Sequence, residues 1–556
     1  MKKYVKKISL VVFAVSFVAL ALNSCASSNV ESNAPDAETN ASQSVFSKEE
    51  FLASVKDLSK NSEYEKALEK YSEIPSSYQK KYADDYELNL LKVRLYELTG
   101  RLTQAQSLAD KMLLKNKNNE ELKKIKFSIE KKLFMAELQD ALKNQDENAA
   151  LELYEDIDSA IAEDFNINLI KASLLVSANR FDEAENLCKK LEAADKSNVE
   201  VMEIRLAIAE KKGDNKEKQK QLKAIVAKDP YNAPANIQLG ESAALNKNYK
   251  QAKNYYLKAL AKESRNEDAL FGYGQMDYYL ENDEKATETF NKLLEINPQN
   301  PQAYSYLAKL AYADDKFQIA IANVEKALQI DDSNGEYYMN YGLYLRSAGR
   351  FADAENAWTK AIEIMPEYFL PYAYRAGLYD EQDKFPQALA DYQKVIQLNP
   401  EYYYAYESIG VLALHEKDYK TAGDAFFNCR KYNQENISYP LMVTYCYYMM
   451  NNKAEGKKYS GKILPKIKGA PNSIEYKMLR VYHDEAGHNS LPQEIARLTN
   501  VNDRGKMYFY LGLFYQMYGS TEAANEMFAK VINMNSPMFF EYRLAEWAIE
   551  ANKADK

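Results

Sequence analysis

The side chains that could carry out chemistry are few and scattered in this chain. Of its 556 residues, only three are histidine. His415 falls on a solvent-facing position of a predicted helix, and His483 and His488 are five residues apart. Two metal ligands on one helix face need a separation of three or four residues. We therefore expect no metal site, no catalytic residue and no cofactor, and we expect that the protein is not an enzyme.

Short motifs that resemble catalytic sequences lack the partners that such sites need. Two S-x-x-K sequences, at residues 77–80 and 128–131, are not accompanied by S-D-N or K-T-G. Cys188, Cys429 and Cys446 fall at or beside positions that the helical pattern buries, which suits small apolar side chains. Because Cys429 and Cys446 are predicted on facing helices, a disulfide between them stays possible in an oxidising compartment.

The dominant pattern is a repeat of 34 residues between Ala233 and Asn436, with six units and no insertion. Small residues recur in two columns that are twelve positions apart. If roughly one residue in ten is alanine, six in register is about a one-in-a-million event. The two columns are Ala252, Ala286, Ala320, Ala354, Ala388 and Ala422, and Gly240, Gly274, Ala308, Gly342, Ala376 and Gly410.

Each unit predicts two antiparallel helices. Apolar residues at unit positions 4, 7, 8 and 11 form one helix face, and a second set follows a turn at positions 17, 20, 24 and 27. Small residues at positions 8 and 20 let the two backbones approach, while aromatic residues at 4 and 24 fill the space around them. Pro298, Pro366 and Pro400 end the second helix of their units. One hairpin cannot bury its own apolar face, so the units must stack into a solenoid.

These small-residue, aromatic and proline columns resemble the tetratricopeptide repeat. The resemblance implies an all-α fold, an α-α superhelix (solenoid) of stacked helical hairpins, with about fourteen units in this chain. It also implies a protein-binding scaffold without chemistry of its own.

The repeat continues beyond the regular block at both ends. We expect degenerate helical repeats at 48–164 and regular repeats at 165–436, although residues 199–232 fit only in part. Residues 437–504 keep the spacing but lose the small residues, which predicts diverged repeats. Gly512 and Ala524 restore the pattern at 505–538, and residues 539–556 predict a capping helix.

The N-terminus has the features of a targeting segment. Four lysines at positions 2, 3, 6 and 7 precede a 15-residue apolar run from Ile8 to Leu22. This run predicts a signal peptide at 1–24 rather than a membrane span, which needs about 20 residues. Residues 22–25 resemble a bacterial lipobox, which implies cleavage before Cys25 and lipidation of its sulfur, whereas the alternative is an ordinary signal peptide.

The segment that follows Cys25 is poor in large apolar residues, so residues 25–47 predict a flexible tether. With these features the chain resembles a tetratricopeptide-repeat bacterial lipoprotein. In lipoproteins an aspartate after the lipidated cysteine can mean retention in the inner membrane. Since Ala26 stands there, we expect a lipid anchor in the cell envelope at the outer membrane, on its periplasmic face or on the cell surface.

Most of the 45 tyrosines and 21 phenylalanines fall on predicted core positions, but some do not. Unit positions 5, 9, 12 and 13 form a stripe about 100° away from the packing face of the first helix. The resemblance implies that this stripe lines a concave groove for a partner peptide, although the same side chains could instead pack under their neighbours. The stripe carries Phe271, Tyr278, Tyr279, Tyr312, Met339, Leu343, Tyr445 and Tyr448.

The formal net charge of −9 argues against nucleic acid and against anionic membrane surfaces as partners. The first hypothesis is a non-catalytic, lipid-anchored scaffold that binds other envelope proteins or peptides and supports assembly of an envelope or secretion complex, with no small-molecule substrate. The second is a surface-exposed ligand-binding lipoprotein or adhesin. The third is an accessory subunit whose catalytic partner is another chain.

Overall fold

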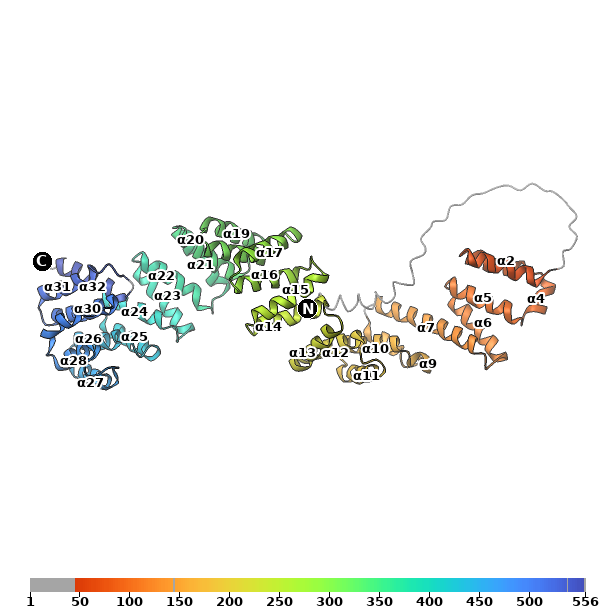
Figure 1. Ribbon diagram of the computed structural model, residues 1–556, viewed down its shortest axis with the longest axis horizontal. Coiled ribbons are helices and arrows are strands. Elements are labelled where there is room, and N and C mark those ends of the chain that lie inside the picture. Colours follow the sequence, from red (N-terminus) through yellow and green to blue (C-terminus); the bar gives the residue numbers. More distant parts are fainter. Residues whose placement is uncertain (1–45, 144–145, 538, 555–556) are drawn as a thin grey trace. The chain divides into compact units, whose positions relative to one another are not determined.

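The computed structural model describes residues 46–143, 146–537 and 539–554 (Figure 1). These residues form helices and connecting segments without any β-strand, which confirms the all-α prediction. The predicted signal peptide, Cys25 and almost all of the predicted tether lie outside the described residues. The chain divides after Ala269 into two compact units.

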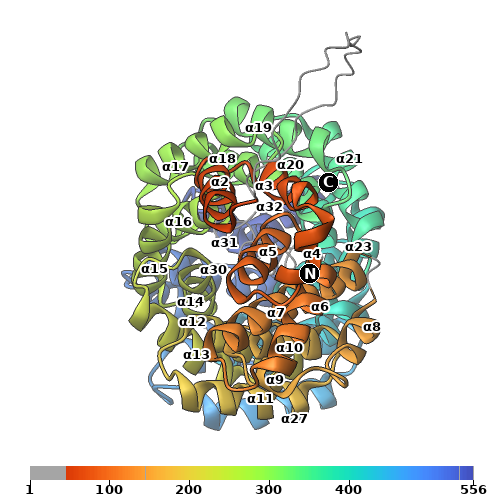
Figure 2. The same cartoon turned by 90° about the vertical axis from the view of Figure 1, so that its right-hand side faces the viewer.

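Six consecutive hairpins follow the regular block of the sequence, each with a first helix of 13 and a second helix of 14 residues. Figure 2 shows α18 and α20 on the inner side of the curve and α19 and α21 outside them. The helices are α14 (Ala233–Leu245), α15 (Tyr249–Lys262), α16 (Glu267–Tyr279), α17 (Asp283–Ile296), α18 (Pro301–Ala313), α19 (Phe317–Ile330), α20 (Gly335–Ser347), α21 (Phe351–Ile364), α22 (Phe369–Glu381), α23 (Phe385–Leu398), α24 (Tyr403–His415) and α25 (Tyr419–Tyr432).

Capping asparagines start several of the first helices. The side chains of Asn232, Asn300 and Asn334 accept hydrogen bonds from backbone amides in the first turns of α14, α18 and α20. Such a cap satisfies one of the amide groups that a helix start leaves without a partner. These asparagines occupy the same position of their units, so they start the first helix at the same point in these three units.

The glycine column marks where the two helices of a hairpin touch. A Cβ atom placed on Gly240 or Gly410 would lie 2.9 or 2.8 Å from the ring of Tyr256 or Phe426, sixteen residues later. The alanines of the other column, from Ala252 to Ala422, are fully buried, and so is Ala524. The small residues that define the repeat in the sequence are thus the places of closest packing.

The described helices before the regular block are less uniform. Among them α7 is a single helix of 24 residues. The elements are α2 (Lys48–Lys60), α3 (Tyr64–Glu69), η1 (Lys70–Glu73), α4 (Ser76–Tyr82), α5 (Tyr86–Leu98), α6 (Leu102–Lys115), α7 (Glu120–Lys143), α8 (Glu147–Glu152), α9 (Ser159–Ala162), α10 (Phe165–Ser177), α11 (Phe181–Ala194), α12 (Val199–Lys212) and α13 (Asn215–Lys228).

After α25 the hairpins become irregular, and short helices replace some of the 14-residue second helices. The short α29 holds six residues, and one continuous hydrophobic core extends from Val411 to Ala545. The elements are α26 (Ser438–Met449), α27 (Lys453–Ile463), η2 (Leu464–Lys466), α28 (Ile474–Asp484), η3 (His488–Ser490), α29 (Leu491–Ala496), α30 (Val501–Met517), α31 (Thr521–Ile532) and α32 (Phe540–Ala554).

Buried tyrosines connect the first helices of this C-terminal part. The hydroxyl of Tyr448 on α26 donates to the carbonyl of Tyr482 on α28 at 2.6 Å, and the Tyr482 hydroxyl donates to the carbonyl of Tyr510 on α30 at 2.6 Å. The Tyr510 hydroxyl in turn lies 3.3 Å from the carbonyl of Ser438, at the start of α26. Helices α26, α28 and α30 therefore pack as one group rather than as separate hairpins.

Within the described part of the chain, no helix is long and apolar enough to cross a membrane. The three described cysteines are buried free thiols, so Cys429 and Cys446 are not joined by a disulfide here. Burial raises the pKa of both thiols, which suits the structural role predicted for them.

Candidate functional site

Three of the predicted groove residues lie together on α16, around an aromatic residue of α18 that the sequence reasoning missed, and a fourth, Tyr312, lies further along α18. The ring of Tyr306 on α18 lies 5.7 Å from Phe271 and 5.3 Å from Tyr278, between ring centroids. Tyr278 lies 5.5 Å from Tyr279, and Tyr312 contacts Tyr344 of α20 at 4.9 Å. We call Phe271, Tyr278, Tyr279, Tyr306 and Tyr312 the aromatic strip.

Hydrogen bonds hold the polar ends of the strip in place. The side-chain amide of Gln275 donates to the Tyr306 hydroxyl at 2.9 Å, and the hydroxyls of Tyr279 and Tyr306 are 3.4 Å apart. The hydroxyl of Tyr312 lies 3.2 Å from that of Ser347 on α20. Burial raises the pKa of Tyr306 well above its ordinary value, so this hydroxyl stays protonated. The Lys309 ammonium adds a cation–π contact at 4.7 Å from the Tyr306 ring.

Some rings of the aromatic strip are buried by packing, and others are exposed to solvent. Tyr279 is 46% exposed, whereas Phe271, Tyr278 and Tyr312 are half-buried and Tyr306 is buried. Phe271 also lies 6.1 Å from the core ring of Phe290 on α17, so part of its surface serves packing within its own hairpin. The available surface is therefore centred on Tyr279 and the outer edges of Tyr278 and Tyr312.

The other predicted groove residues are less available to a partner. Met339 and Leu343 on α20 are half-buried, and the Met339 carbonyl accepts a hydrogen bond from the Trp358 indole at 3.0 Å. Tyr445 and Tyr448 on α26 are only 8% and 5% exposed, so neither has the exposure expected of groove residues. The reason is that α28 and α30 pack directly on α26, and the 34-residue pattern does not reveal this.

A second surface joins α32 to helices far back in the sequence. The guanidinium of Arg543 forms an ion pair with Asp380 at the end of α22 at 2.7 Å and another with Asp383 at 3.3 Å. Trp547, one helical turn later, contacts the ring of His415 on α24 at 4.3 Å and that of Phe385 at 5.8 Å. We call Asp380, Asp383, Phe385 and His415 the helix seat. Asp380 and His415 occupy stripe positions 12 and 13, but no sequence signal connects them to α32.

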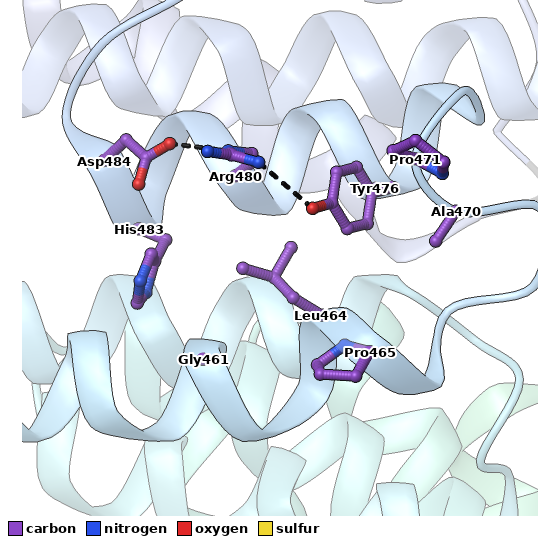
Figure 3. A pocket seen from close by; sticks show the side chains of 9 residues that line it. All are labelled: Gly461, Leu464, Pro465, Ala470, Pro471, Tyr476, Arg480, His483 and Asp484. Carbon is purple, nitrogen blue, oxygen red and sulfur yellow. Dashed lines mark hydrogen bonds and ion pairs between the residues drawn. The ribbon is translucent and has the colours of Figure 1, made fainter.

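A hollow of about 480 Å³ lies in the diverged region beside α27 and α28 (Figure 3). Its basic group is already engaged, because Arg480 is paired with Asp484 at 2.6 Å and donates to the Tyr476 hydroxyl at 3.2 Å. His483 lies 3.0 Å from the Ser460 hydroxyl. Among the described residues no three His, Cys, Asp or Glu side chains are grouped so that they could hold a metal ion. The positive charge of Arg480 is therefore not available to bind a ligand in this hollow.

The fold and these surfaces define a superhelical scaffold of helical hairpins whose first helices carry the candidate contact residues. Comparison with protein families identifies the type of helical hairpin. Residues 243–310 match one model of the tetratricopeptide repeat, and residues 307–367 and 375–429 match another. These segments are tetratricopeptide repeats, a class of repeat that acts as a protein-interaction scaffold.

Several solved structures are similar to parts of this chain. A tetratricopeptide repeat protein from Parabacteroides merdae is 22% identical, covers 45% of this chain and 98% of its own, and gives a TM-score of 0.35. PilF of Pseudomonas aeruginosa is also 22% identical, with 40% and 98% covered and a TM-score of 0.31. PilW, a type IV pilus biogenesis factor, is 16% identical, with 38% and 98% covered and a TM-score of 0.30. No curated protein is significantly similar in sequence.

Proposed function

We propose that the protein is a non-catalytic scaffold of the bacterial cell envelope that binds an envelope protein or peptide on the aromatic strip. We further propose that a lipid on Cys25 anchors it at the outer membrane and that it supports assembly of an envelope or secretion complex. The single observation that carries the binding proposal is the continuous run of rings on α16 and α18 that ends in the exposed Tyr279.

The strip has the properties of a preorganised binding surface. Tyrosine offers a large apolar ring and a hydroxyl, and such residues often dominate the binding energy of protein interfaces. Since Gln275 and Ser347 already hold the hydroxyls of Tyr306 and Tyr312, a partner would lose little affinity to the ordering of these side chains. A peptide that places apolar side chains on the rings and backbone groups near the hydroxyls fits this surface.

The anchoring part of the proposal rests on the sequence. The lysines, the apolar run and the lipobox-like residues 22–25 precede a polar segment of about twenty residues. Such a tether spans roughly 25 Å and would hold the repeats away from the lipid headgroups. Two or more acyl chains would make this attachment stable, since a single chain binds only weakly.

The test is crosslinking in cells followed by recovery of the protein, compared between the natural chain and a Tyr279→Ala/Tyr312→Ala variant. A Tyr432→Ala variant is the matched control, because Tyr432 is similarly exposed at the end of α25 but lies off the strip. We expect the double variant to lose one set of envelope proteins, with affinity lowered roughly 10-fold or more. Recovery of the same partners by all three proteins would overturn the assignment of the binding site.

Two further measurements address the anchor and the exposure of the protein. A Cys25→Ser variant should leave the membrane fraction, and unchanged membrane association would contradict lipidation at this residue. Treatment of intact cells with protease should leave a periplasmic scaffold intact. Degradation would instead favour a surface-exposed ligand-binding lipoprotein or adhesin.

A further inference from the structure

The C-terminal helix α32 has two faces that pack on different elements of the chain. One face packs on the preceding hairpin, where Leu544 and Ala545 are buried and the side chain of Asn552 is hydrogen-bonded to those of Gln516 and Asn525. This is the contact expected of a capping helix. The other face carries Arg543 and Trp547, one turn apart, and lies against α24 (Figure 1).

This second face meets the helix seat through complementary charges and rings. The Arg543 guanidinium, besides its ion pairs with Asp380 and Asp383, donates to the Asp380 carbonyl at 3.3 Å. The same guanidinium lies over the ring of Trp547 at 4.3 Å and that of Phe385 at 5.6 Å. Arginine and tryptophan are among the residue types that are enriched at the binding hot spots of protein interfaces.

The seat requires a cation. Asp380 has only 18% of its side chain exposed, and a carboxylate this buried is costly unless a positive charge compensates it. The neighbouring Glu381 does not compete for Arg543, since it is paired with Arg346 on α20. Asp380 and Asp383 are thus left for a basic residue from the helix that occupies the seat.

We propose that the helix seat is a binding site for an amphipathic helix that carries an arginine and, four residues later, a tryptophan, and that α32 fills this site in cis. A partner helix with the same pair of residues would displace α32 and occupy the stripe of α22 and α24. This second binding site is independent of the aromatic strip, so it goes beyond the function proposed above.

The contact at the seat is partly open to solvent, whereas the face of α32 that carries Glu541 and Ala545 is buried and must also separate when α32 is displaced. The Arg543 side chain is 31% exposed and that of Asp383 is 75% exposed, so this ion pair is screened and weak. An attached helix has an effective concentration in the millimolar range, and a partner must overcome this advantage. Cleavage of the loop between α31 and α32 removes this advantage in effective concentration and leaves every residue in place.

The experiment uses the full chain with a site for a specific protease inserted after Asn535, an exposed residue in the loop between α31 and α32. The probe is a labelled synthetic peptide with the sequence of residues 540–554, and its binding is measured by fluorescence anisotropy before and after cleavage. We expect no binding to the uncut protein and exchange of the probe into the cleaved protein. Absence of exchange at millimolar peptide would overturn the proposal that α32 is replaceable.

Competing peptides test whether the helix seat recognises Arg543 and Trp547. A peptide with alanine in place of Arg543 and Trp547 should compete roughly 10-fold or more weakly than the natural peptide. A control peptide with Glu550→Ala, an exposed position of α32, should compete normally. Equal competition by all three peptides would overturn the proposal, and so would loss of helical circular dichroism on cleavage, since α32 would then be an inseparable part of the core.

Discussion

At the scale of the residue, the hairpins depend on contacts between a glycine and a ring sixteen positions later. A Cβ atom on Gly342 would lie 2.5 Å from the indole nitrogen of Trp358, and one on Gly512 would lie 2.6 Å from the ring of Phe528. Real Cβ atoms do not approach neighbours so closely, so the ring would have to move. These glycines are required because of the space that the facing ring occupies.

Gly342→Ala should lower the free energy of unfolding by about 1–3 kcal/mol, because the core at Trp358 has no room for a methyl group. Gly377→Ala in α22 is the matched control, since a Cβ atom there meets no atom within 4 Å. Alanine also favours a helix, so the control should gain about 0.5–1 kcal/mol. The urea midpoint of each variant checks the pair, and an equal effect at both positions would contradict the packing argument.

A buried carboxyl on α32 makes a prediction about pH. Glu541 is fully buried, its Oε1 accepts a hydrogen bond from the Tyr510 hydroxyl at 2.7 Å, and burial raises its pKa although the positive charge of Lys506 opposes the shift. A carboxyl whose pKa is higher in the folded state favours folding when it is protonated. Stability should therefore decline as the pH rises from the ordinary glutamate pKa toward that of the folded protein.

Glu541→Gln mimics the protonated form and should remove this decline. We expect the variant to melt at a higher temperature than the natural protein at pH 8 and at a similar temperature at pH 4. Thermal unfolding by circular dichroism at both pH values measures the difference. A variant that is less stable at pH 8 would show that the charged carboxylate stabilises α32.

At the scale of the element, every turn inside the six regular hairpins contains one residue with left-handed backbone geometry. Lys247, Glu281, Asp315, Gly349, Asp383 and Lys417 all have φ between 52° and 76° and recur every 34 residues. Only one of them is glycine, the residue that adopts this geometry without strain. The other five turns therefore retain backbone strain.

Glu281→Gly should raise the free energy of unfolding by about 0.5–1 kcal/mol, because glycine relieves the strain of the left-handed turn at some cost in chain entropy. Gly349→Ala should lower it by about 1 kcal/mol, and a Cβ atom there would meet nothing, so the effect belongs to the backbone alone. Urea titration of both variants measures these changes. A destabilised Glu281→Gly protein would contradict the assigned geometry.

The regular hairpins could be predicted from sequence because each contacts only its neighbours. The columns that contain Gly274 and Ala286 report packing within one unit, so their spacing determines the local fold. The positions of Phe271 and Tyr279 on one side of α16 follow from the same period. Tyr306 was missed because its unit position 6 lies outside the assumed stripe, although an aromatic residue next to position 5 is a signal that could have revealed it.

The C-terminal contacts could not be predicted in this way. The ion pair of Arg543 with Asp380 joins residues 163 positions apart, and a 34-residue period carries no information about such a return of the chain. The burial of Tyr445 and Tyr448 has the same origin, since α28 and α30 close over α26 where the small-residue columns are lost. The spacing of side chains predicts contacts between adjacent hairpins of a solenoid, but it does not predict contacts between helices that are far apart in the sequence.

At the scale of the molecule, the second compact unit presents two surfaces on its first helices. The aromatic strip on α16 and α18 is open at Tyr279, while the stripe on α22 and α24 is occupied by α32. Such a scaffold could bind one partner at the aromatic strip at all times. It could bind a second partner at the helix seat only after α32 is displaced. We propose that both surfaces bind other proteins.

The most direct measurement is site-specific photocrosslinking in cells with a benzophenone amino acid at position 279. The same amino acid at position 432 serves as control, since Tyr432 is also exposed but lies away from the strip. We predict that irradiation attaches a defined envelope protein to position 279 and not to position 432. Absence of any specific product at position 279, or the same products at both positions, would contradict the claim that the aromatic strip is the binding surface of the scaffold.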